Sequence, residues 1–151
     1  MMARTALLPL LCGGAILLLF QFVLFLGYVP STSMEPTIMA GSWILGNRLY
    51  SELRRGDIVI FEREGTYLVK RIVAIPGDMV YIDDMTRSVS VNEAIPDASR
   101  VLRVPDGRYF VLGDNKTMSV DSRTWEDVYV DMGSIMALIP QAQLPYELSD
   151  F

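Results

Sequence analysis

Few residue types in this chain could perform catalysis. Its 151 residues include no histidine and one cysteine, Cys12. The absence of histidine excludes His-based triads, histidine metal sites and a histidine general base. Cys12 lies in an apolar segment, so a disulfide, a cysteine nucleophile and a cysteine zinc site are also excluded. A hydrolase of this composition would use paired carboxylates, a carboxylate-bound metal, or a hydroxyl activated by lysine.

The two lysines are Lys70 and Lys116. Lys70 lies in residues 67–75, a predicted strand, where alternation places it on the same face as Leu68 and Ile72. Burial on an apolar face lowers the pKa of a lysine, in extreme cases by about 3–5 units, and would let the amine accept a proton. Alternation alone favours a simpler interpretation, an edge lysine whose amine reaches water. Lys116, in a polar turn, is expected to be a solvated surface charge.

Two other polar segments could supply the rest of a site. In residues 30–37, two prolines restrict the backbone around several hydroxyls, so the segment could present Ser33 as a nucleophile; a plain linker is at least as consistent with its composition. In residues 113–123, Ser119 or Ser122 could hold a neutral lysine by hydrogen bonding; alternatively, this is a polar loop with an ion pair between residues 121 and 123.

The elements that would position these residues are mostly strands. No amphipathic helical pattern separates them, so the fold class is predicted to be all-β, with twisted antiparallel sheets. The turn at residues 83–87 predicts a hairpin. Predicted strands occupy residues 57–61, 67–75, 79–82, 88–91, 109–112 and 134–139.

An apolar segment precedes the strands. Residues 7–29 contain no charge and would span about 34 Å as a helix, enough for a hydrocarbon core of about 30 Å. The run exceeds the apolar core of a cleaved leader and no small-x-small site follows it, so we expect a retained single transmembrane anchor. Arg4 predicts a cytoplasmic N-terminus and an extracytoplasmic β-domain. The predicted organisation is a cytoplasmic stretch (1–5), the anchor (6–29), a catalytic β-domain (30–140) and a loose C-terminal tail (141–151). The net charge of −5 argues against nucleic acid as a partner.

Four segments, taken together, resemble the conserved boxes of bacterial type I signal peptidases, which are Ser-Lys dyad serine proteases. Residues 31–37 resemble the SxSMxPT box, 55–61 the RGDIVVF box, 70–78 the KRxxxxPGD box and 113–123 the GDNxxxSxDSR box. Relatives of the endoplasmic-reticulum type carry histidine in place of the lysine, so the resemblance favours a bacterial enzyme, with the mitochondrial inner-membrane type as the next candidate. The short interval between Asp78 and Gly113 resembles the minimal single-anchor form common in Gram-positive bacteria.

The resemblance implies a mechanism. Ser33 would be the nucleophile and Lys70 the general base, with the Ser31 hydroxyl and the Ser33 N–H forming the oxyanion hole. Ser119 would orient the lysine, and no metal or cofactor would be needed. The supporting residues would be Asp121 and Arg123 as a pair, with Gly113 and Ser122 beside them.

The resemblance also implies a substrate and a location. The substrates would be the signal peptides of secretory preproteins with small residues at −1 and −3, cleaved at the outer face of the cytoplasmic membrane. Met34, Val29 and Val69 are our candidates for the walls of the pockets that receive those residues. The lipid bilayer and the secretion translocon would be the other partners.

Three alternatives remain on sequence grounds. One is a dedicated pilus or envelope-assembly signal peptidase homologue that acts on few substrates. A second is a non-catalytic factor of the same kind. A third is a soluble Ser-Lys autoprotease of the SOS-repressor type, against which the apolar segment argues.

Overall fold

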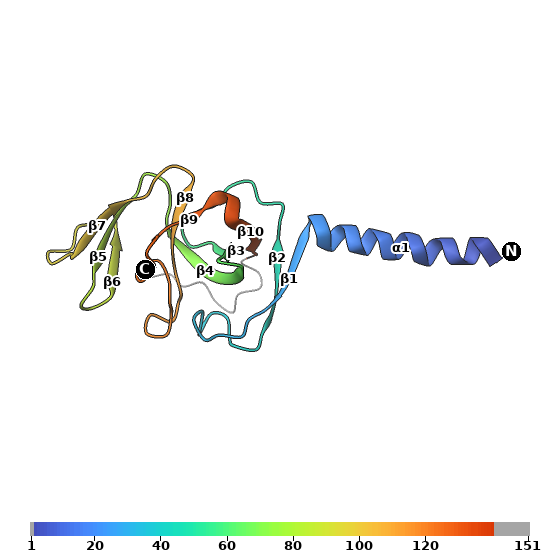
Figure 1. The fold of residues 1–151 in the computed structure, drawn as a ribbon, viewed down its shortest axis with the longest axis horizontal. Coiled ribbons are helices and arrows are strands. Elements are labelled where there is room, and N and C mark those ends of the chain that lie inside the picture. Colours follow the sequence, from blue (N-terminus) through green and yellow to red (C-terminus); the bar gives the residue numbers. More distant parts are fainter. Residues whose placement is uncertain (1, 141–151) are drawn as a thin grey trace.

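A computed structural model describes residues 2–140 of the chain, and the predicted tail at 141–151 lies outside the described residues. A helix projects from one end of a β-structure made of two antiparallel sheets (Figure 1). The larger sheet has the order β1-β2-β10-β3-β4-β8-β9, and the smaller has the order β6-β5-β7. The smaller sheet lies at the end of the molecule opposite the helix (Figure 1).

The elements follow one another with short connections. The helix α1 spans Met2–Phe22, and a 3₁₀ turn, η1, spans Met132–Ser134. The strands are β1 (Leu24–Tyr28), β2 (Trp43–Asn47), β3 (Ile58–Arg63), β4 (Thr66–Ala74), β5 (Met79–Asp83), β6 (Ser88–Val91), β7 (Arg100–Arg103), β8 (Arg108–Leu112), β9 (Val130–Asp131) and β10 (Ile135–Ile139).

The apolar N-terminal segment divides into two elements. The helix ends at Phe22, and Leu24–Tyr28 form strand β1, which pairs antiparallel with β2. The predicted boundary at residue 29 is therefore too late, because the β-structure begins inside the apolar run. In residues 2–140, no helix reaches the length and hydropathy expected of a membrane span.

The antiparallel β-architecture is as predicted. The predicted strands at 57–61, 67–75, 109–112 and 134–139 correspond to β3, β4, β8 and β10, and the hairpin around 83–87 is formed by β5 and β6. The prediction missed β1, β2, β7 and β9. β2 and β7 are short, β9 has two residues, and each pairs with a strand distant in sequence, so local periodicity gives little sign of them.

The core packs around strand β4, an interior strand of the larger sheet. β4 pairs with β3 on one side and with β8 on the other, and its neighbours include the fully buried Phe61 and Phe110. An apolar cluster links the two sheets. In it, Val80 and Ile82 of β5 pack with Ala74 of β4 and with β8. A side chain on β4 is therefore held by packing from both sheets.

Candidate active site

The structure brings Ser33 and Lys70 into direct contact. Ser33 lies in the loop that follows β1, and Lys70 lies in the middle of β4. Lys70 Nζ donates a hydrogen bond to Ser33 Oγ at 2.7 Å. Both residues are buried, with 8% of Ser33 and 3% of Lys70 exposed. A serine hydroxyl and an amine at this separation form a nucleophile–base pair in geometry.

The environment of Lys70 disfavours its charged form. Burial lowers the pKa of Lys70 below its ordinary value, and the nearby Arg123 acts in the same direction. The carboxylates of Asp121 and Asp114 oppose this shift without cancelling it. The favoured interpretation from alternation, an edge lysine with its amine in water, is therefore wrong, because β4 is an interior strand.

The loop around Ser33 also holds the expected oxyanion groups. Ser31 Oγ lies 3.3 Å from Ser33 Oγ, and Ser31 is exposed. Among the described residues, no acceptor is hydrogen-bonded to the Ser33 N–H. The Ser33 carbonyl oxygen is occupied, since it accepts from the Asn115 N–H at 3.0 Å.

The loop after β8 packs against the loop that contains Ser33. We call the latter, residues 29–42, the nucleophile loop after its candidate nucleophile. Gly113 leaves no room for a side chain: a Cβ there would lie 2.6 Å from Ser119 Cβ and would also collide with Ser119 Oγ and the Ser33 carbonyl oxygen. Ser119 is buried, and its Oγ has no hydrogen-bond partner among residues 2–140. The expected bond from Ser119 to Lys70 is therefore not formed in this structure, and the orienting role of Ser119 stays a prediction.

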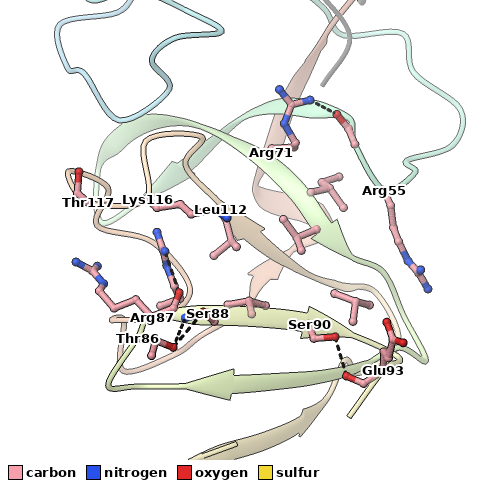
Figure 2. A pocket seen from close by; sticks show the side chains of 16 residues that line it. Arg55, Arg71, Thr86, Arg87, Ser88, Ser90, Glu93, Leu112, Lys116 and Thr117 are labelled. Carbon is pink, nitrogen blue, oxygen red and sulfur yellow. Dashed lines mark hydrogen bonds between the residues drawn. The ribbon is translucent and has the colours of Figure 1, made fainter. Parts of the chain in front are cut away.

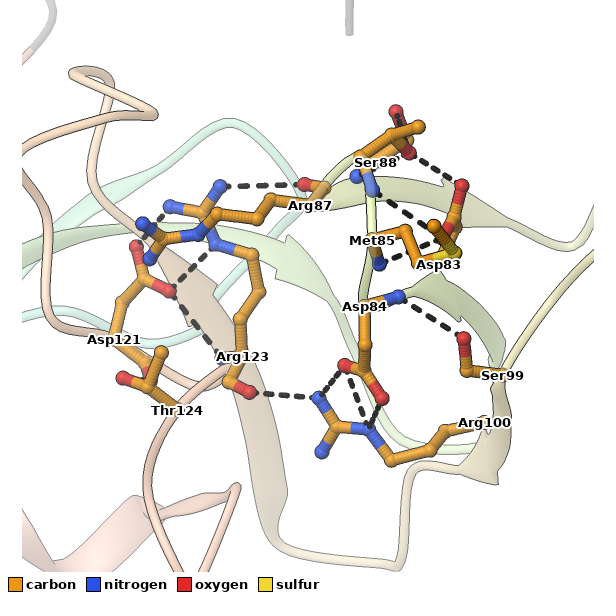
Figure 3. A network of polar contacts seen from close by, with 11 residues as sticks. Asp83, Asp84, Met85, Arg87, Ser88, Ser99, Arg100, Asp121, Arg123 and Thr124 are labelled. Carbon is orange, nitrogen blue, oxygen red and sulfur yellow. Dashed lines mark hydrogen bonds and ion pairs between the residues drawn. The ribbon is translucent and has the colours of Figure 1, made fainter.

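A buried ion pair supports the same loop. Arg123 donates to Asp121 through Nε at 2.8 Å and through Nη2 at 2.6 Å (Figure 3). The Gly113 N–H donates to Asp121 Oδ2 at 3.0 Å. Burial alone would raise the pKa of Asp121, but the bonds from Arg123 and Gly113 lower it overall. The Ser119 hydroxyl acts in the same direction without reaching hydrogen-bonding geometry. Ser122 Oγ accepts from the Val111 N–H at 3.0 Å and so ties the loop to β8.

A second buried ion pair, between Arg71 and Asp114, was not predicted from the sequence. Arg71 donates to Asp114 through Nε at 2.8 Å and Nη2 at 2.7 Å, and its Nη1 donates to the Gly56 carbonyl oxygen at 2.8 Å. The Arg71 and Asp114 side chains are 7% and 2% exposed. Arg71 also lies 3.5 Å from Thr37 Oγ1 on the nucleophile loop. The residue next to the candidate base thus connects all four boxes, and the presence of Arg71 and Asp114 within these boxes was the available signal.

The candidate pocket walls are less accessible than expected. Met34 has no exposed surface and Val29 is 4% exposed, because both belong to the apolar cluster between β2, β3 and β10. Only Val69, which packs against that cluster, is half-buried. In this structure Met34 and Val29 lie beneath the surface near Ser33 and do not line an open pocket.

No metal-binding cluster is present in the described part of the chain: no three His, Cys, Asp or Glu side chains there are placed to share an ion.

With this geometry in view, comparison with known proteins identifies the class. The family model described as "Signal peptidase, peptidase S26" matches residues 2–95 and 83–145. The chain therefore belongs to the signal peptidase family, peptidase S26.

The relatives place the chain among the type I enzymes. It is 35% identical over 130 residues to signal peptidase I of Bacillus licheniformis, which covers 70% of each protein. It is 33% identical over 130 residues to signal peptidase I T of Bacillus subtilis, covering 70% of this chain and 67% of that protein. A crystal structure of a signal peptidase I from Enterococcus faecalis matches with a TM-score of 0.46 and 24% identity, covering 60% of this chain and 98% of that chain. The resemblance predicted from the four boxes is confirmed by the sequence matches.

Proposed function

We propose that this enzyme removes N-terminal signal peptides from preproteins through an acyl-enzyme on Ser33, with Lys70 as the general base. The observation that carries the proposal is the 2.7 Å contact between Lys70 Nζ and Ser33 Oγ, made by a buried lysine whose pKa is lowered. A neutral amine at this position can accept the hydroxyl proton, which a charged lysine cannot do.

The reaction then has two stages. Ser33 Oγ attacks the scissile carbonyl carbon while its proton passes to Lys70 Nζ; the protonated amine gives this proton to the leaving nitrogen as the peptide bond breaks. Lys70, neutral again, takes a proton from a water that attacks the ester. Collapse of the second tetrahedral intermediate breaks the ester bond and returns the proton to Ser33 Oγ.

The negative charge of both tetrahedral intermediates falls on the former carbonyl oxygen. The Ser33 N–H and the Ser31 hydroxyl are the donors we assign to it, supported by the 3.3 Å separation of the two serine oxygens. Loss of one such donor typically costs about 3–4 kcal/mol of transition-state stabilisation.

We assign the substrate from the family to which the chain belongs. We assign the membrane location from the exposed apolar surface of α1. Large apolar side chains cover α1, including Leu10 and Leu17, which are 72% and 73% exposed. We propose that this surface is buried in the cytoplasmic membrane, so that a signal peptide's apolar core lies beside α1 and its cleavage site reaches Ser33. Small residues at −3 and −1 would face the wall that contains Val69.

The test is cleavage of a preprotein with alanine at −3 and −1 by the detergent-solubilised enzyme. We expect a cut after the −1 alanine, no cleavage by Ser33→Ala or Lys70→Ala, and wild-type thermal unfolding for Ser33→Ala. Cleavage by Lys70→Ala at more than about 1% of the wild-type rate would contradict the general-base role, since such a role contributes about 10²–10⁴-fold.

A further inference from the structure

A cleft separate from the Ser33–Lys70 pair lies on the side of β4 that faces the smaller sheet. The cleft has a volume of about 610 Å³ and includes neither Ser33 nor Lys70 among its lining residues. Figure 2 shows Arg87 and Lys116 at one end of it and Arg55 and Glu93 at the other. Its charged lining residues are Arg55, Arg71, Arg87, Lys116, Arg123 and Glu93.

The lining is basic in a chain whose net charge is −5. Three of its five cations, Arg55, Arg71 and Arg123, are ion-paired with carboxylates that are outside the lining. Arg87 and Lys116 form no ion pair among residues 2–140, and Lys116 is exposed and has no hydrogen-bond partner there. An anionic ligand would therefore be attracted to the end of the cleft where Arg87 and Lys116 lie.

One wall of the cleft is an edge strand. Residues 86–91, which include all of β6, line the cleft consecutively. β6 pairs with β5 on one side and is the end strand of its sheet; no other strand within residues 2–140 pairs with its second edge, which could therefore receive an extended peptide. The ligand that fits both the edge and the charge is an extended peptide carrying carboxylates.

The cleft adjoins the nucleophile loop. Asn115 bonds to the Ser33 carbonyl oxygen, and the next residue, Lys116, lines the cleft. On β4, Lys70 contacts Ser33 and the next residue, Arg71, lines the cleft. A substrate chain would pass between the two sites along Asn115 and Lys116, which are adjacent residues about 3.8 Å apart at Cα, so a few extended residues cover the distance. The smaller sheet, whose strand β6 lines the cleft, is at the end opposite α1 (Figure 1). The part of the substrate that leads away from α1 would therefore run toward the cleft.

We propose that this cleft binds the mature part of the substrate, about residues +3 to +8 after the cleavage site, as a strand along β6, and that it favours acidic segments. The proposal rests on the proposed function, because it places the substrate by Ser33. The chain's own residues 141–151 contain Glu147 and Asp150 and are the competing source of carboxylates.

The test compares three peptides with alanine at −3 and −1 that carry three aspartates, three serines or three lysines between +3 and +8. We expect the KM of the acidic peptide to be about tenfold below that of the serine peptide at low salt, with similar kcat, and the difference to vanish at about 0.5 M salt. Lys116→Glu should abolish this preference. Arg103→Glu, at an exposed position of β7 that does not line the cleft, makes the same charge change and should keep it.

A binding measurement separates this proposal from the proposed function. The acidic mature segment alone, which has no scissile bond, should bind by fluorescence anisotropy and lose affinity with Lys116→Glu, even if no substrate were cleaved. Equal affinity for the acidic and serine segments, or equal effects of Lys116→Glu and Arg103→Glu, would overturn it. A several-fold gain in affinity for the acidic segment in Glu147→Gln/Asp150→Asn would assign the cleft to the chain's own residues and would also overturn it.

Discussion

Substitution of Gly113 offers the sharpest test of how the loop after β8 positions Ser33. In Gly113→Ala, the new Cβ would lie 2.6 Å from Ser119 Cβ and against the Ser33 carbonyl oxygen, closer than such atoms approach in proteins. Backbone forms one side of this contact, so a rotamer change of Ser119 cannot relieve it and the nucleophile loop must move. A displacement of about 1 Å between reacting groups can lower the rate about 10²-fold. We therefore expect kcat to fall about 100-fold, with a loss of about 1–3 kcal/mol in the free energy of unfolding from overpacking.

Two other glycines provide matched controls. Gly133→Ala meets nothing within 4 Å and should leave both kcat and thermal unfolding unchanged. Gly46→Ala places a Cβ 2.7 Å from Ala137 Cβ in the core, so it should lower the unfolding temperature while kcat of the folded enzyme stays within about threefold of wild type. Cleavage assays well below the unfolding midpoints of all three variants give kcat. A Gly113→Ala enzyme with kcat within about threefold of wild type would refute the close coupling of the two loops.

Four further predictions concern charge and the membrane. Because burial lowers the pKa of Lys70, kcat/KM should rise with pH to a plateau reached below the ordinary lysine value of 10.5. Across the same window the unfolded chain binds more protons, so the free energy of unfolding should rise with pH in wild type and lose this contribution in Lys70→Met, as measured by urea unfolding at several pH values. Arg123→Met should shift the rising limb of the pH–rate profile to higher pH, because Asp121 would then act on the amine unopposed; an unmoved limb would contradict this. Leu17→Glu should reduce cosedimentation with lipid vesicles but leave cleavage of a short peptide in detergent unchanged; equal cosedimentation would argue against a membrane role for α1.

The sequence predicted the antiparallel fold and the residues of the candidate site. It did not predict how the fold surrounds those residues. Alternation placed Lys70 with Leu68 and Ile72, yet it could not tell an edge strand from an interior one. That distinction depends on β8, whose pairing with β4 joins residues about 40 positions apart. The burial that lowers the pKa of Lys70 is therefore a property of strand order, which local periodicity does not contain.

The predicted end of the apolar helix at residue 29 was wrong for a related reason. Leu24–Tyr28 continue the apolar character of α1, and hydropathy alone does not separate a buried strand from the end of an apolar helix. The element that makes them a strand is β2, which contains Gly46 and Asn47 and pairs with them across an intervening loop. Ser33 thus lies in the loop that follows β1, a strand of the larger sheet.

The two buried ion pairs explain how the pKa of Lys70 can stay lowered beside so many charges. Asp121 and Asp114 each favour the protonated amine of Lys70, but each is bonded to an arginine, Arg123 and Arg71 respectively. The pairs connect Gly113, the nucleophile loop and β4 with directional hydrogen bonds, while each pair adds no net charge near the amine. Apolar side chains would keep the lysine neutral without these bonds, and unpaired carboxylates would hold it protonated. Paired charges meet both requirements, which gives a physical reason for arginine and aspartate inside the boxes that surround a serine and a lysine.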